Sequence, residues 1–204
     1  MESLAAKILA LLPQTQCTRC GYPDCAAYAQ AIAQDTAGIN QCPPGGAQGI
    51  EWLAAITGQP IVALNPAHGA EGPRRIALII EDWCIGCTLC IKACPTDAIV
   101  GCNKLMHTVI EAYCTGCELC LPVCPVDCIA LENVTDAATG WTAWSRPQAD
   151  LARSRYEFHS YRLNRDNGEN DKRLEEKALD KKHTVIEAAL ERARAKRGSG
   201  KSGG

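Results

Sequence analysis

The chain has 204 residues, of which 14 are cysteine and one is phenylalanine, and its formal net charge is −2. Aromatic side chains make up only 5% of the sequence, so we expect no large conventional hydrophobic core, and small domains of this kind usually depend on disulfides or metal. The N-terminus has no secretory signal, and its longest apolar run, residues 8–12, is far short of the roughly 20 residues that span a bilayer. We therefore expect a soluble, cytoplasmic protein whose cysteines bind metal.

Charge is distributed unevenly along the chain. Residues 1–145 carry 6 Lys/Arg and 13 Asp/Glu, a net charge of −7, whereas residues 146–204 carry 15 and 10, a net charge of +5. A body that binds nucleic acid would be basic, and the basic segment here has few aromatic residues on which bases could stack. We therefore expect no nucleic-acid partner.

Residues 1–58 are predicted to be helical, in the segments SLAAKILALL (3–12), CAAYAQAIAQ (25–34) and AQGIEWLAAIT (47–57). Gly38 and Gly58 are placed where helices would end, since glycine is common at helix C-termini. This region forms the first predicted domain.

Four cysteines surround the second of these segments in the pattern C-x2-C-x4-C-x16-C, namely Cys17, Cys20, Cys25 and Cys42. A helix after Cys25 would return the chain to the site, and the two prolines after Cys42 would stop the chain from extending that helix. Four cysteines at this spacing suit an iron–sulfur cluster, but structural zinc sites also tolerate varied spacing. The spacing alone leaves both open.

Residues 59–74 contain three prolines and two glycines and are predicted to be a linker. Beyond it the chain repeats itself at a shift of 30 residues, so that EDWCIGCTLCIKACPTDAI (81–99) aligns with EAYCTGCELCLPVCPVDCI (111–129). Short strands are predicted in RIALII (75–80), TVIEA (108–112) and CIALEN (128–133). Residues 75–135 therefore form a second domain built on an internal duplication.

Each copy contains the run C-x2-C-x2-C-x3-C-P. Three closely spaced thiolates can approach three corners of a cuboidal iron–sulfur cluster, and Gly86 and Gly116 allow the backbone to wrap tightly around it. Zinc sites usually group their cysteines in separated pairs. The duplicated run therefore favours iron–sulfur clusters over structural zinc.

On these motifs, residues 75–135 resemble the bacterial-type two-cluster ferredoxins, a small α+β fold over two [4Fe-4S] clusters that transfers single electrons. In such ferredoxins the fourth cysteine of each run ligates the other cluster. The resemblance therefore assigns cluster 1 to Cys84, Cys87, Cys90 and Cys124. It assigns cluster 2 to Cys114, Cys117, Cys120 and Cys94.

Four residues near these runs have no ligand role. Cys102 and Cys128 lie outside the runs and are expected to be small core residues. Trp83 and Tyr113 each precede the first cysteine of a run, and we expect both rings to pack near a cluster and exclude water.

The segment LPQTQCTRCGYPDCAAYAQAI, followed by INQCPPGG, resembles the four-cysteine domain of the B subunit of Rnf-type electron transport complexes. In that family this domain precedes a two-cluster ferredoxin domain, and the resemblance covers residues 8–135. It implies a third [4Fe-4S] cluster on Cys17, Cys20, Cys25 and Cys42. The family usually has a membrane helix ahead of this domain. We expect none here, and hence peripheral association with the cytoplasmic face of the inner membrane through a complex.

Residues 136–197 are charged and predicted to be mostly helical, and residues 198–204 to be a disordered tail. Both signs of charge alternate along the helix, which is typical of a solvated helix and is a poor membrane signal. A thin apolar stripe runs along it, formed by Leu174, Ala178, Val185, Ile186, Ala189, Leu190 and Ala193.

The sequence thus predicts an α+β protein with a small helical four-cysteine domain, a two-cluster ferredoxin domain and a charged C-terminal helix. Its expected function is to pass single electrons through three [4Fe-4S] clusters between redox proteins, such as a reductase, a dehydrogenase or Rnf-type subunits. One alternative is a subunit of a larger membrane-associated oxidoreductase complex. Another is a two-cluster ferredoxin with a structural zinc in its first domain. An independent enzyme is disfavoured, because the chain has no Rossmann glycine fingerprint and its four histidines are scattered.

Overall fold

The structure is a computed structural model that describes residues 2–199, and it divides into two compact units with the boundary between His159 and Ser160. Helices and small antiparallel sheets make up the first unit, in agreement with the predicted α+β class. None of the described helices combines the length and the apolarity that crossing a membrane requires.

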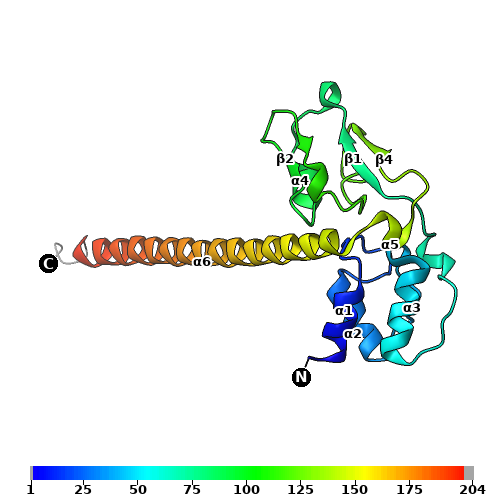
Figure 1. Cartoon of the computed structure of the whole chain (residues 1–204). Coiled ribbons are helices and arrows are strands. Elements are labelled where there is room, and N and C mark those ends of the chain that lie inside the picture. The colour runs from blue at the N-terminus through cyan, green and yellow to red at the C-terminus, as the bar shows by residue number, and fades with distance from the viewer. Residues whose placement is uncertain (1, 200–204) are drawn as a thin grey trace. The chain divides into compact units, whose positions relative to one another are not determined.

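The three helices predicted in residues 1–58 are all present, as α1 (Leu4–Leu11), α2 (Cys25–Ala33) and α3 (Gly46–Thr57). They pack against one another, as Figure 1 shows. The side chain of Asp24 caps α2 by accepting a hydrogen bond from the backbone N–H of Ala27 at 2.7 Å, which satisfies a donor of the first turn. The core between the helices is formed by fully buried side chains that include Ile8, Tyr28, Ile32 and Leu53.

One of the two predicted glycine caps is correct. Gly58 follows α3 in the left-handed conformation, with φ 73°. The prediction for Gly38 is wrong, because α2 ends at Ala33 and the left-handed residue after it is Asp35, with φ 55°. The N–H of Thr36 donates to the carbonyl of Ala31 at 2.9 Å, which closes the helix end without a glycine.

Two short antiparallel sheets form the duplicated region. Strand β1 (Arg75–Ile79) pairs with β4 (Ile129–Asn133), so that the first and last predicted strands meet. The two-residue strands β2 (Ile99–Val100) and β3 (Thr108–Val109) pair with each other. The segment TVIEA forms only this short strand, because a 3-10 turn begins at residue 111. The helix α4 (Leu89–Ala93) lies within the first copy.

The segment 59–74 is irregular apart from the short 3-10 helix η2 (Pro66–His68), and hydrogen bonds tie it to its neighbours. Nδ1 of His68 lies 3.0 Å from the carbonyl oxygen of Arg19. The carboxylate of Glu71 accepts from the N–H of Ala47 at 3.0 Å and from the hydroxyl of Thr139 at 2.7 Å. Hydrogen bonds therefore fix the segment both to the N-terminal helical region and to a residue near the C-terminal end of the first unit.

The chain ends in the short helix α5 (Gly140–Ala143) and the long helix α6 (Arg146–Ser199). The prediction of a C-terminal helix is confirmed. In the second unit Leu174, Val185, Ile186 and Leu190 of the apolar stripe are exposed. The side chain of Ala193 and the tail from residue 200 onward lie outside what the structure describes, whereas residues 198 and 199 end α6.

Candidate metal centres

Three cysteines of the second copy and the last cysteine of the first line one small cavity: Cys94, Cys114, Cys117 and Cys120. The rest of the wall is made of small or apolar groups that include Ala77, Ala98, Ile99 and Leu131. The short helical turn η4 (Glu111–Tyr113) brings the chain to Cys114, and the pairing of β1 with β4 closes the cavity from the other side. The structure thus brings together the four residues predicted to hold cluster 2.

A second cavity is lined by Cys84, Cys87, Cys90 and Cys124, the four residues predicted for cluster 1. Its wall also contains His107, whose Nδ1 lies 3.3 Å from Sγ of Cys90. Cys128 is buried, as expected, with its Sγ 3.5 Å from that of Cys124. The expectation that Cys102 is also a core residue is wrong, because it lies exposed in the loop between β2 and β3.

The remaining four cysteines are Cys17, Cys20, Cys25 and Cys42. They approach one another beside the start of α2, close enough to perturb each other electrostatically. The buried side chain of Gln16 holds the start of α2 by accepting from the N–H of Cys25 at 3.0 Å.

The returning loop of this site is fixed through Tyr28. Its hydroxyl donates to the carbonyl of Gly38 at 2.8 Å and accepts from the N–H of Gln41 at 3.1 Å. Because Gln41 precedes Cys42, the buried tyrosine places the fourth cysteine beside the first three. Gly38 therefore serves as an acceptor in this loop and not as a helix cap.

Burial raises the pKa of several of these thiols. In the N-terminal set desolvation raises the pKa of Cys20 and Cys42, and it raises that of Cys25 to about 12. In the cluster 2 set it raises the pKa of Cys117 to about 11 and that of Cys120 to about 12. Thiols of this kind are protonated at neutral pH unless a cation stabilises the thiolate. A metal centre would therefore displace protons as it binds.

Backbone amides point at two of the sulfurs. The N–H of Ala98 donates to Sγ of Cys94 at 3.1 Å, and the N–H of Ala77 donates to Sγ of Cys114 at 3.5 Å. Hydrogen bonds to ligand sulfur are one of the means by which proteins set the potential of an iron–sulfur cluster.

Within residues 2–199, no three His, Cys, Asp or Glu side chains converge as they would around a single metal ion. Four free thiols around a small cavity, with amides aimed at sulfur, fit the ligation of an iron–sulfur cluster.

The N-terminal cysteine set adjoins the second copy of the duplication. The hydroxyl of Thr115, next to Cys114, donates to the backbone carbonyl of Thr15 at 2.9 Å, and both threonines are buried. Thr15 stands two residues before Cys17. This hydrogen bond therefore links the loop of the N-terminal set to the loop of the cluster 2 set.

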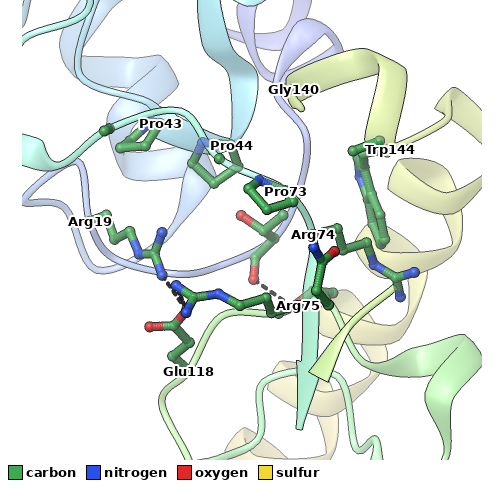
Figure 2. A pocket seen from close by; sticks show the side chains of 16 residues that line it. Arg19, Pro43, Pro44, Pro73, Arg74, Arg75, Glu118, Gly140 and Trp144 are labelled. Atoms are coloured by element: carbon green, nitrogen blue, oxygen red, sulfur yellow. Dashed lines mark hydrogen bonds and ion pairs between the residues drawn. The ribbon is translucent and has the colours of Figure 1, made fainter. Parts of the chain in front are cut away.

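A cavity of about 310 Å³ lies beside this contact (Figure 2). Arg19 and Arg75 reach Glu118 from opposite sides, with N–O distances of 2.8 and 3.3 Å. On the far wall the guanidinium of Arg74 lies over the ring of Trp144, 4.8 Å from its centroid. The cavity is therefore lined by three arginines, of which two share one carboxylate.

The two aromatic residues that precede the runs differ in their surroundings. Trp83 is 61% exposed, so the expectation that its ring packs near a cluster is wrong. Tyr113 is half-buried beneath the guanidinium of Arg155, which lies 3.6 Å from the ring centroid. Sequence reasoning missed Arg155 and His159, because neither has a motif and both act on residues about 60 positions away.

Two protein-family models match the chain. One, described as "4Fe-4S dicluster domain", matches residues 77–131, and the other, described as "Putative Fe-S cluster", matches residues 12–44. The matched segments contain the cysteine sets described above. Together with the cavities, they define an iron–sulfur electron-transfer protein with [4Fe-4S] cofactors.

Several related proteins are described as the B subunit of an ion-translocating oxidoreductase complex. That of Azoarcus sp. (strain BH72) is 55% identical over 153 residues, which cover 75% of this chain and 83% of the relative. That of Thiobacillus denitrificans is 57% identical over 106 residues, or 52% and 56% of the two chains. That of Hahella chejuensis is 54% identical over 142 residues, or 70% and 71%. The chain belongs to this family of B subunits. The resemblance to Rnf-type B subunits and the expectation of iron–sulfur electron transfer are therefore confirmed.

Proposed function

We propose that the chain holds three [4Fe-4S] clusters and passes single electrons through them in series between redox partners. The proposed ligands are Cys17, Cys20, Cys25 and Cys42 for the N-terminal cluster. They are Cys114, Cys117, Cys120 and Cys94 for cluster 2, and Cys84, Cys87, Cys90 and Cys124 for cluster 1. The observation that carries the proposal is the grouping of twelve of the 14 cysteines into three sets of four, two of which line separate cavities.

The contact between Thr15 and Thr115 supports a proposed order of the clusters. Electron tunnelling weakens steeply with distance, so an electron moves between neighbouring clusters. The N-terminal set adjoins the cluster 2 loop through this buried hydrogen bond. Cluster 2 and cluster 1 are bound by the same duplicated unit, and each run supplies its last cysteine to the other cavity. The proposed series is therefore the N-terminal cluster, cluster 2, then cluster 1.

The relatives are named as subunits of an ion-translocating oxidoreductase complex. We propose that this chain also works as a subunit of such a complex. It would exchange electrons with other redox subunits at the cytoplasmic face of the inner membrane. Its own residues would supply the thiolates, exclude water from the clusters and hold the three sites at fixed separations.

Anaerobic quantitation of iron and sulfide, with EPR of the reduced protein, tests the cluster count. Three [4Fe-4S] sites predict about 12 Fe per chain. Replacing Cys42 by Ala should remove about four of them, because a four-thiolate site loses its fourth ligand. The matched control is Cys102→Ala, which changes an exposed cysteine outside all three sets. About 8 Fe with one zinc in the unaltered protein would refute the N-terminal cluster.

A further inference from the structure

The two cysteine-lined cavities of the duplicated unit are surrounded by corresponding residues, and these residues differ in exposure between the two cavities. At a shift of 30 residues, Ile85 corresponds to Thr115 and Val126 corresponds to Thr96. In the second of each pair the side chain is buried, with 6% and 1% of its surface exposed, whereas Ile85 and Val126 are 57% and 37% exposed. The cavity lined by Cys94, Cys114, Cys117 and Cys120 thus has a covered face, with Thr96 and Thr115, and the other cavity has an open face at the corresponding positions.

The first turns of α6 cover the face on which Thr96 and Thr115 are buried, which we call the closed face. The guanidinium of Arg155 stacks over the ring of Tyr113 and donates to the carbonyl oxygens of Thr96, at 2.6 Å, and Asp97, at 3.2 Å. One helical turn later, Nδ1 of His159 lies 2.8 Å from the carboxylate of Asp97. The cover is therefore a helix that carries two basic residues four positions apart.

The open face presents the same acceptors in the same backbone conformation. Asp127 corresponds to Asp97, and the two have left-handed φ angles of 49° and 51°. Trp83 supplies the ring that corresponds to Tyr113. Within residues 2–159, no side chain bonds to the carbonyl oxygens of Val126 and Asp127 or to the Asp127 carboxylate, and no cation lies over Trp83.

The surroundings of this face are apolar in the centre and acidic at the edge. Leu105 and Met106, in the loop between β2 and β3, are 61% and 59% exposed. Glu81 and Asp82 flank Trp83, and both are exposed. Large exposed apolar side chains that lie together mark interaction sites, and tryptophan and arginine contribute strongly to such interfaces. An acidic rim selects a basic partner surface.

We propose that the open face, defined as Trp83, Ile85, Val126 and Asp127, binds a different redox protein through a helix that carries an arginine. This arginine takes the place that Arg155 has on the closed face, over the Trp83 ring and against the two unbonded carbonyls. The inference rests on the proposed function, since it makes cluster 1 the point at which electrons pass to or from that partner. Cluster 2 is covered by the chain itself and serves only as an internal relay.

A second copy of the chain fits this face less well than a different protein does. The segment of this chain that covers the closed face, with Arg155 and His159 one turn apart, is already engaged there. Releasing it to cover the open face of another copy would uncover its own. The partner is therefore a protein with its own basic helix.

Site-specific photo-crosslinking of the full chain in cells tests the proposal. A benzophenone amino acid replaces Trp83 in one variant and Ile61, an equally exposed apolar residue at 67%, in the control. The expected result is a cross-link from position 83, and not from position 61, to another redox protein. Peptide mapping should place it within one helical turn of an arginine. Cross-links only to lipid, only to a second copy of this chain, or no more than from position 61, would overturn the proposal.

A charge reversal sharpens the test. Asp127→Lys in the photo-crosslinking variant should lower the yield about fivefold or more, because it removes the acidic partner of the arginine helix. Asp136→Lys is the matched control, since Asp136 is exposed and has nearly the same φ of 50°, so both changes impose similar backbone strain. Equal yields in the two variants would refute the docking mode. Iron content and EPR of the same proteins report on the proposed function separately, so a failed cluster count and a failed docking site are distinguishable.

Discussion

Replacing Thr115 by Val tests whether the buried hydrogen bond to the carbonyl of Thr15 joins the N-terminal and cluster 2 loops. Valine has nearly the shape of threonine, so the change removes the hydroxyl and leaves the carbonyl of Thr15 buried without its donor. An unsatisfied buried group of this kind costs about 1–3 kcal/mol. In a unit of this size each kcal/mol shifts a melting midpoint by about 2–4 °C, so we expect a decrease of about 2–12 °C.

The assay is anaerobic thermal melting followed by the visible absorbance of the clusters, with iron content measured before heating. Thr15→Val is the matched control, because it removes a buried hydroxyl at the other end of the contact but leaves the accepting backbone carbonyl in place. If the Thr115 variant melts together with the Thr15 variant, the hydrogen bond does not hold the two loops together. The cluster order that depends on it would then lose its support.

Two further comparisons probe the framework around the sites. Trp144→Phe should lower stability by about 1–3 kcal/mol more than Trp141→Phe in chemical denaturation, because the indole N–H of Trp144 donates to a buried carbonyl at 2.8 Å and that of Trp141 has no partner among the described residues. Gly116→Ala should cost about 2–4 kcal/mol and Gly58→Ala about 1 kcal/mol, with the apparent melting midpoint as readout. Both glycines have positive φ, but a Cβ at residue 116 would strike the carbonyl oxygen of Arg75, whereas at residue 58 it would meet open space. Similar costs within either pair would contradict these assignments.

The local parts of the molecule could be predicted from the sequence. The spacing of the cysteine runs and their duplication predict which thiols meet, because a tight loop brings neighbours in sequence to one centre. The exchange of Cys94 and Cys124 between the cavities was predicted from the resemblance to two-cluster ferredoxins and not from the spacing. Helices were predictable where apolar periodicity and capping agreed. The error at Gly38 arose because a hydrogen bond from Thr36 and a left-handed Asp35 ended the helix earlier than the nearest glycine.

The contacts between distant segments could not be predicted in this way. Trp144 and Pro13 are 131 residues apart, and Arg155 acts on Thr96 across 59 residues, so no local pattern connects them. The exposure of Trp83 and the burial of Tyr113 follow from the same cause. In sequence both residues stand one position before a first cysteine, and only the position of α6 distinguishes them.

The duplication therefore accounts for the metal sites and not for the difference between them. A duplicated unit with two like faces gives an electron two equivalent exits. In this chain the N-terminal domain, through Thr15, and the first turns of α6, through Arg155, both cover the cavity lined by Cys94, Cys114, Cys117 and Cys120. The cavity lined by Cys84, Cys87, Cys90 and Cys124 keeps the exposed Trp83 beside it, and within residues 2–159 no side chain pairs with the carboxylate of Asp127. In the proposed electron path, covering one face and leaving its counterpart open turns a symmetric pair of clusters into a directed series. That direction, from the N-terminal set to the open face or the reverse, is a property of the added segments and not of the cysteine motifs.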